Sequence, residues 1–197
     1  MEQVQPQLIN RKQFFDNIKR FGLITKFTQL QVDSIDAILD EIEALKITNK
    51  GQQAYIFATA YHEAFDFNGK QTGTIQRIVP IQEGGSQAYL KNLWYYPYIG
   101  YGFVQVTHLK NYEKVQRAYK LIKGIDIDIV GSPKKLLDIK ISAFAIVYGM
   151  QVGMFTGKKL NDYIGVKFDF RNARKIVNGM DKASEIATHA SNFLRCL

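Results

Sequence analysis

The chain has 197 residues, of which 46% are hydrophobic and 13% aromatic, which is enough to build one domain with a sizeable core and too apolar for a disordered chain. It carries 26 Lys and Arg against 18 Asp and Glu, a formal net charge of +8, and it has no run of about 18 apolar residues that would indicate a membrane span. The single cysteine, Cys196, excludes an internal disulfide framework and fits synthesis in a reducing compartment.

The first third of the chain is predicted to be helical. Residues 1–9 form a loose, Gln-rich lead-in, without the basic start and apolar run of a secretory signal. Residues 10–21 repeat large apolar residues at helical spacing. A second helix begins at Thr28, and Gln31, three residues on, completes the pattern of a capping box. The acids of this helix lie mainly off its apolar stripe, and we expect a solvated face made of Asp33, Asp36, Asp40 and Glu41.

A third helix is predicted over residues 52–65, and it carries the first candidate for chemistry. It is mostly apolar and presents His62 and Glu63 at its C-terminal end. Burial in such a setting disfavours the charged form of a carboxylate, so we expect Glu63 to hold a proton near neutral pH, as a general acid must. A surface glutamate is the simpler interpretation of this helix taken alone. We expect His62 to orient the helix end rather than to act as a base.

Residues 66–101 change character. They contain five glycines, two prolines and a β-prone stretch at residues 74–79, which predicts a loop-rich lobe with a short β-hairpin. A loop this long inside a compact domain is usually functional. Aromatic rings stack on sugars and on bases alike, and we expect at least two rings here to line a cleft. The candidates are Trp94, Tyr96 and Tyr101.

Helical patterns return in the second half. Residues 111–123 form an amphipathic pattern, and Ser132-Pro133 supplies a cap residue and a first-turn proline. We expect these two residues to open a long apolar helix that runs through Met150 and forms the centre of the core. A last helix is predicted over residues 181–194.

The charge of the chain lies entirely in this second half. Residues 1–108 hold 10 basic and 10 acidic side chains, whereas residues 109–197 hold 16 and 8. This asymmetry indicates a polyanionic partner, such as an anionic bacterial envelope, an anionic membrane face or nucleic acid, while solubility is the alternative explanation. Because the basic residues form no run of five or six, we expect no nucleic-acid partner.

The histidines are widely spaced. We expect His108 to hydrogen-bond locally and His189 to be structural or exposed. Three dispersed histidines and one cysteine show no metal-ligand spacing, and no phosphate-binding glycine motif is present. The sequence therefore predicts no metal and no other cofactor.

Several short motifs occur together in a recognisable order. They are His62-Glu63 at a helix end, Pro80-Ile81-Gln82-Glu83, Gly100-Tyr101-Gly102-Phe103-Val104-Gln105-Val106-Thr107, Asn111-Tyr112 and Asn172-Ala173-Arg174-Lys175-Ile176-Val177-Asn178-Gly179. Together, over about residues 11–197, they resemble the family-19 chitinase-like glycoside hydrolases, most closely the branch used as phage endolysins. The resemblance implies a mainly α, α+β lysozyme-like fold over residues 1–197. In it, a helical bundle surrounds a buried core helix, and the loop lobe forms one wall of a substrate cleft.

The resemblance also implies roles for single residues. Glu63 matches the general acid, Glu83 the general base that activates a water, and Thr107 a residue that helps hold that water. An acid in a Gly-rich, wet loop such as the one around Glu83 stays ionised. Two carboxylates on separate elements suit an inverting mechanism, which needs them roughly 6.5–9.5 Å apart. Polar substrate contacts are implied for Gln105, Asn111 and Asn178.

The sequence departs from the family pattern at two places. Gly100-Tyr101-Gly102 stands where Gly-Arg-Gly is usual, so an arginine contact is missing there, and Arg77 is a candidate to replace it. Residues 64–69 lack the common turn that follows the general acid, which affects the expected geometry of the subsites more than the chemistry.

The resemblance implies a monomeric phage endolysin that hydrolyses β-1,4 bonds of the peptidoglycan glycan strand. The basic second half, the lack of a secretory signal and the lack of a cysteine-rich chitin-binding module favour peptidoglycan over chitin. Such an enzyme is made in the host cytoplasm and reaches the wall through a separate membrane pore protein. The alternatives are a chitinase acting on chitin oligomers, a lytic transglycosylase that uses Glu63 alone, and a non-enzymatic envelope-binding module.

Overall fold

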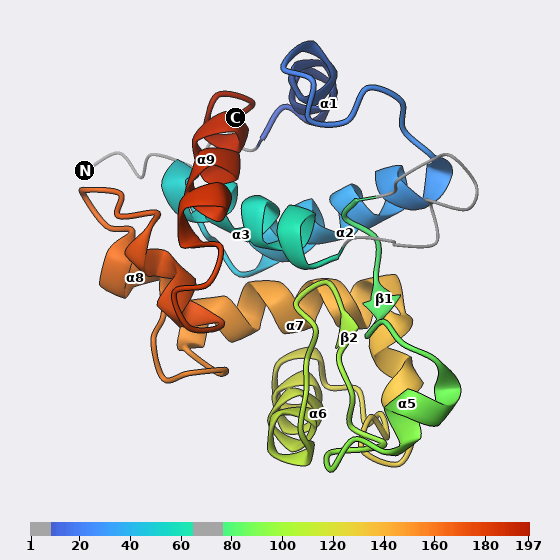
Figure 1. Cartoon of the computed structure of the whole chain (residues 1–197). Helices are drawn as coiled ribbons and strands as arrows, with labels where there is room; N and C mark the ends of the chain where they lie inside the picture. The colour runs from blue at the N-terminus through green and yellow to red at the C-terminus, as the bar shows by residue number, and fades with distance from the viewer. Residues whose placement is uncertain (1–8, 65–76) are drawn as a thin grey trace.

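Two helices with apolar residues on every side form the centre of the molecule. Helix α3 (Lys50–Glu63) buries every residue from 53 to 61, and α7 (Ile139–Val152) buries every residue from 141 to 147. A helix that is hydrophobic all round must be covered on all sides. Accordingly, α9 (Ala183–Leu194) packs on α3, while α2 (Gln29–Ala44) and α6 (Leu109–Lys123) pack on α7 (Figure 1). The expected core helix is present, and α3 shares its role.

The computed structural model describes residues 9–64 and 77–197. In these residues the remaining elements are α1 (Arg11–Arg20), β1 (Ile81–Gln82), α5 (Gln87–Lys91), β2 (Tyr101–Gly102), the 3-10 helix η1 (Pro133–Leu137), α8 (Leu160–Tyr163) and the 3-10 helix η2 (Asn172–Ile176). The predicted class, mainly α with a small β component, is confirmed. None of the helices in the described residues combines the length and the apolar character that crossing a membrane requires.

The helix expected to open at Ser132-Pro133 is in fact two elements. Pro133 starts η1, the side chain of Ser132 makes no capping hydrogen bond, and α7 begins only at Ile139. Between them Asp138 is extended, and its carboxylate accepts hydrogen bonds from the backbone N–H groups of Lys140 and Ile141 at 2.9 and 3.1 Å. Asp138 is therefore the true N-cap, and this part of the prediction was wrong because a stronger capping residue follows the Ser-Pro pair.

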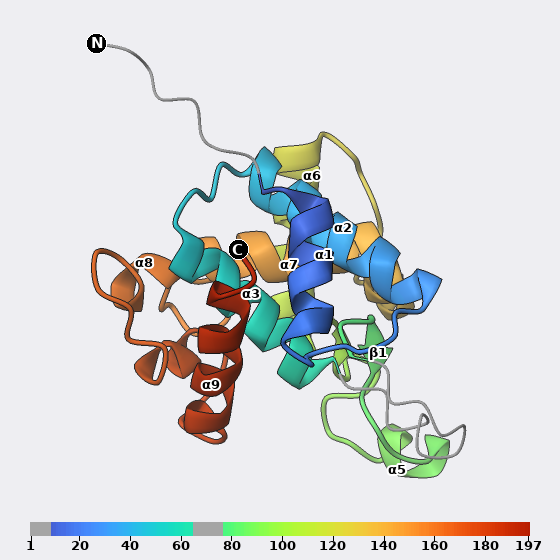
Figure 2. The ribbon, with the colours of Figure 1, turned by 90° about the horizontal axis from the view of Figure 1, so that it is seen from above.

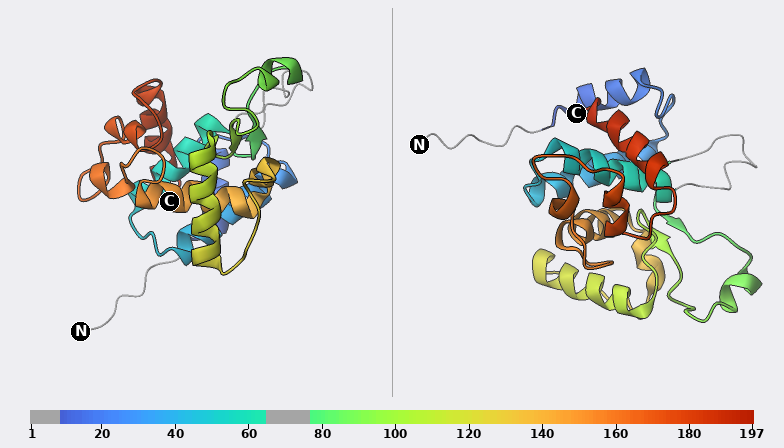
Figure 3. Two further views of the ribbon diagram at one scale, coloured as in Figure 1. Left: turned by 90° about the horizontal axis from the view of Figure 1, so that it is seen from below. Right: turned by 60° about the vertical axis from the view of Figure 1, so that its left-hand side comes forward.

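A short antiparallel sheet lies at the base of the lobe. β1 pairs antiparallel with β2, with Ile81 opposite Gly102 and Gln82 opposite Tyr101. Of the β-prone stretch at residues 74–79, on which the hairpin was predicted, residues 74–76 lie outside the described residues. Between the strands, α5 and its flanking loops extend away from the helical body (Figures 2 and 3).

The acidic face of α2 is not merely solvated. The guanidinium of Arg11 on α1 contacts Asp36, Asp40 and Glu43 at 3.2, 2.7 and 3.0 Å. Glu41 is buried and pairs with Lys123 of α6 at 2.6 Å. The acids therefore attach two neighbouring helices to α2, which the pattern of a single helix cannot show.

Gly102 in β2 allows the lobe to approach the core. Its φ is +87°, and a Cβ there would lie 2.6 Å from Ser142 Oγ and 2.9 Å from the carbonyl oxygen of Leu136. We expect Gly102→Ala to lower the free energy of unfolding by about 2–3 kcal/mol, because it adds both an overlap and an unfavourable φ. Chemical denaturation monitored by circular dichroism measures this change.

Gly124→Ala is the matched control for that substitution. Gly124 has a comparable φ of +70°, but a Cβ there would meet nothing within 4 Å. Its loss should therefore report the backbone term alone, about 1 kcal/mol. Equal losses in the two variants would contradict the close approach of Gly102 to Ser142 and Leu136.

Candidate active site

Glu63 is the last residue of α3, and its carboxylate is held by an arginine from another part of the chain. Its side chain is 17% exposed, and its Oε1 accepts a hydrogen bond from Nη1 of Arg174 in η2. Arg174 is itself buried, at 4% exposure, and its Nε donates to the carbonyl oxygen of Asp181 at 3.0 Å. The arginine thereby connects the end of α3 to the segment that precedes α9.

Arg174 is a partner of Glu63 that sequence reasoning missed. The argument for a protonated Glu63 considered only the apolar helix that carries it. Burial disfavours the charged form of a carboxylate, whereas a neighbouring guanidinium favours it. The contact with Arg174 therefore opposes the effect on which the sequence argument relied. The available clue in the sequence was that Arg174 lies inside one of the motifs that carry the family resemblance.

Glu83 follows β1, and two donors fix its carboxylate. Oε1 accepts from the hydroxyl of Tyr95 at 2.8 Å, and Oε2 accepts from the backbone N–H of Gly100 at 2.8 Å. Desolvation and the bond to Glu83 raise the pKa of Tyr95 to about 12, so Tyr95 remains a proton donor to Glu83 across the physiological range. Hydrogen bonds of this kind stabilise a carboxylate in its ionised form.

Two more of the predicted site residues, Gln105 and Thr107, lie near Gly100. Tyr101 and Val106 form an antiparallel bridge, so Thr107, the next residue, comes beside Gly100 on the neighbouring segment. The hydroxyl of Thr107 donates to the carbonyl oxygen of Gln105 at 2.8 Å. The Oε1 of Gln105 lies only 2.8 Å from the point where a Cβ on Gly100 would stand. Glu83, Gln105 and Thr107 thus all lie around Gly100.

The ends of the two acid-bearing elements are neighbours. The carbonyl oxygen of Ala64, directly after Glu63, accepts a backbone hydrogen bond from Ile78 at 3.1 Å. Ile78 and Glu83 are five positions apart in the chain, and a fully extended chain of that length spans at most about 17 Å. Figures 1 and 3 show β1 and β2 beside the C-terminal end of α3. The fold therefore places the two acids in one region of the molecule.

The predicted aromatic wall is present only in part. Trp94 is 84% exposed and stacks on the ring of His108 at 5.0 Å, and Tyr96 is 43% exposed. Tyr101, in contrast, is 5% exposed and belongs to the hydrophobic core. A buried ring cannot offer a face to a ligand, so the assignment of Tyr101 to substrate binding was wrong, and Trp94 and Tyr96 remain as candidates.

The other predicted contacts have local roles in the structure. Asn111 donates from Nδ2 to the carbonyl oxygen of Thr107 at 3.0 Å, and it therefore supports the segment that carries Thr107. Asn178 lies in the exposed turn before α9, and its backbone N–H donates to the carbonyl oxygen of Arg174 at 3.0 Å. Arg77, the candidate to replace the missing arginine contact, lies against Tyr61. Its guanidinium stacks on the ring of Tyr61 at 4.3 Å and donates to that residue's carbonyl oxygen at 2.9 Å.

His62 faces α9. Its Nδ1 lies 3.7 Å from Oε1 of Glu185, which also approaches Nε2 of His189 at 3.8 Å. Burial lowers the pKa of both histidines below the usual value. The side chain of His62 thus packs against α9.

Comparison with known proteins concerns the fold. No protein-family model and no curated protein sequence matches this chain. Among solved structures, the chain is similar to the crystal structure of a chitinase C mutant, over 98% of this chain and 96% of that chain, with 14% sequence identity and a TM-score of 0.57. An identity this low shows a shared fold, which is therefore chitinase- and lysozyme-like.

Proposed function

We propose that this chain is a glycoside hydrolase that cleaves the β-1,4-linked N-acetylhexosamine backbone of bacterial peptidoglycan. The observation that carries the proposal is a pair of acids at neighbouring element ends, each fixed by its own donors: Glu63 by Arg174, and Glu83 by Tyr95 and Gly100. The chitinase-like fold supports it, since that fold is known to accommodate polysaccharide cleavage in the chitinase named above.

The proposed mechanism divides the work between the two carboxylates. Arg174 holds Oε1 of Glu63, and we assign the other oxygen, Oε2, to the proton that passes to the glycosidic oxygen of the leaving sugar. Glu83, held in place by its two donors, accepts a proton from a water that attacks the anomeric carbon from the opposite face. Thr107 helps to orient this water. This division gives inversion at the anomeric carbon.

The substrate assignment rests on charge and on exposed rings. The 16 basic against 8 acidic residues after position 108 favour an anionic wall polymer over neutral chitin. Trp94 and Tyr96 offer exposed aromatic faces on which sugar rings can stack. Lysis of a bacterial host by a phage is the biological role that we infer from this combination.

Product analysis of wild type and Glu83→Gln tests the mechanism. On purified peptidoglycan, we expect wild type to release reducing ends that carry oxygen from ¹⁸O-labelled water and that appear first as the α anomer in NMR spectra. Glu83→Gln should lower the rate by about 10²–10⁴, because the variant cannot accept the water's proton. Glu113→Gln, which removes an exposed acid on α6, is the matched control and should leave the rate unchanged.

Other outcomes would select the alternatives. Anhydro ends without labelled oxygen, together with a silent Glu83→Gln, would identify a lytic transglycosylase. Faster cleavage of chitin oligomers than of peptidoglycan would identify a chitinase. Salt-sensitive binding to cell walls without any new ends, in wild type itself, would overturn hydrolysis altogether.

A further inference from the structure

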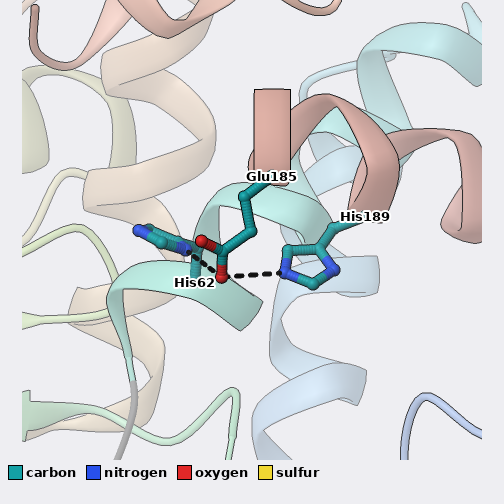
Figure 4. A group of neighbouring side chains, drawn as sticks. All are labelled: His62, Glu185 and His189. Carbon is teal, nitrogen blue, oxygen red and sulfur yellow. Dashed lines mark ion pairs between the residues drawn. The ribbon is translucent and has the colours of Figure 1, made fainter. Parts of the chain in front are cut away.

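A cluster of three potential metal ligands lies between α3 and α9. His62 comes from the last turn of α3, and Glu185 and His189 are four residues apart on α9, so both project from the same face of that helix. Oε1 of Glu185 lies 3.7 Å from Nδ1 of His62 and 3.8 Å from Nε2 of His189 (Figure 4). One ligand atom from each residue falls within 4.8 Å of the other two.

The polar atoms of this cluster are not satisfied by one another. Hydrogen bonds between nitrogen and oxygen span 2.7–3.2 Å, and both separations exceed this range. Nε2 of His189 is buried and makes no hydrogen bond to any described residue. Buried polar atoms are almost always paired, so a converging set with an unpaired nitrogen indicates that a further group belongs between them.

The spacing fits a shared metal ion. Zinc binds histidine nitrogen and carboxylate oxygen at about 2.0–2.1 Å in a tetrahedral arrangement, so neighbouring ligand atoms stand about 3.3 Å apart. Rotations of the three side chains would have to close the 3.7 and 3.8 Å separations from Glu185, and the separation of the two histidine nitrogens, which lie within 4.8 Å of each other, to that value. We propose that His62, Glu185 and His189 form a binding site for a zinc-class transition-metal ion, with one coordination position left open.

The chemistry of the ligands selects the class of ion. Two imidazoles and one carboxylate suit zinc, copper or nickel, whereas calcium and magnesium require oxygen ligands. Burial lowers the pKa of both imidazoles, and neutral imidazoles are the form that binds metal. Two cations lie nearby: Arg174 pairs with Glu63, and Arg77 lies over the ring of Tyr61, where its charge adds to the effect of burial in lowering the pKa of both histidines.

The consequence of binding is a link between two helices. The ion would join α9 to the last turn of α3, which also carries Glu63. This role does not depend on hydrolysis, and it extends beyond the proposed function. The three ligands are dispersed along the sequence, which is why their spacing predicted no metal, and the packing of α9 on α3 brings two of the three histidines together.

Isothermal titration with zinc chloride, on the full chain without an affinity tag, tests the site. We expect one zinc ion per chain and a rise in Tm on the order of 5–10 °C at a free zinc concentration about a hundred times Kd. Cobalt should give the intense visible absorption of a tetrahedral site, and magnesium should give no shift. Glu185→Gln and His189→Ala should each weaken zinc binding at least tenfold and abolish the thermal shift.

His108→Ala is the matched control, because it removes the one histidine of the sequence outside the cluster. It should bind zinc as wild type does. Undiminished binding by Glu185→Gln, or loss of binding in His108→Ala, would overturn the site, as would the absence of binding by wild type. Glu185 is 47% exposed, so Glu185→Gln keeps the test decisive if His189→Ala fails to fold. None of these experiments measures hydrolysis, so a failure of the proposed hydrolase function would be distinguishable from a failure of the metal site.

Discussion

Glu63→Gln should reduce glycan cleavage by about 10²–10⁴ while leaving the protein folded. The amide has the size of the carboxylate and can still accept the hydrogen bond of Arg174 through its oxygen. It cannot give a proton to the leaving sugar, and loss of a general acid costs a factor of this order. The loss of turbidity of a cell-wall suspension, followed together with the release of reducing ends, measures the effect.

The control for Glu63→Gln is again Glu113→Gln, which makes the same substitution at an exposed position. Circular dichroism and a thermal melt establish that Glu63→Gln is folded at the assay temperature. Full activity of a folded Glu63→Gln would remove the acid from the mechanism. The proposed function would fall with it, because Glu83 alone cannot protonate the leaving group.

Arg174→Met should be the most destabilising of the single substitutions considered, lowering the free energy of unfolding by about 3–5 kcal/mol. Arg174 is 4% exposed, so its removal leaves the carboxyl group of Glu63, itself only 17% exposed, without the guanidinium that holds it, and breaking a buried pair from one side costs this amount. The bond to the carbonyl oxygen of Asp181 is lost as well. For a chain of this length, the Tm should fall by about 6–20 °C.

A double-mutant cycle separates the ion pair from simple packing. Arg174→Met, Glu63→Gln and the double variant are compared by urea unfolding, with Arg117→Met on the exposed face of α6 as the control for removing a guanidinium. We expect the double variant to be more stable than the sum of the single effects predicts, by about 0.5–3 kcal/mol. Strict additivity would mean that Arg174 acts through packing and through Asp181 rather than through Glu63.

Patterns within a few residues were sufficient to predict the helices. The capping box at Thr28 and Gln31 forms as expected, and the apolar stretch before Glu63 becomes α3, with Glu63 at its end. The largest boundary error, at Ser132-Pro133, arose because Asp138 competes as a cap. Smaller differences remain: α3, predicted over residues 52–65, is Lys50–Glu63, and α5 was not predicted. These features are decided by neighbours three or four residues away, which the sequence displays directly.

Partners that are far apart in the sequence could not be predicted in the same way. The acids of α2 looked solvated, yet Glu41 is buried against Lys123. Tyr101 looked like a binding residue, yet its ring belongs to the core. Both outcomes depend on which helix or strand covers a given face, and a pattern along one element does not contain that information.

The candidate site shows the same division. The sequence by itself predicted the two acids, Thr107 and the order of the motifs that carry them, because these residue types and spacings can be recognised locally. Only the tertiary structure decided what each acid touches: Arg174 reaches Glu63 across 111 residues, and His189 meets His62 when α9 packs on α3. The physical reason is that burial and ion pairing, which set the chemistry of a side chain, arise from packing between elements rather than from the element that carries it.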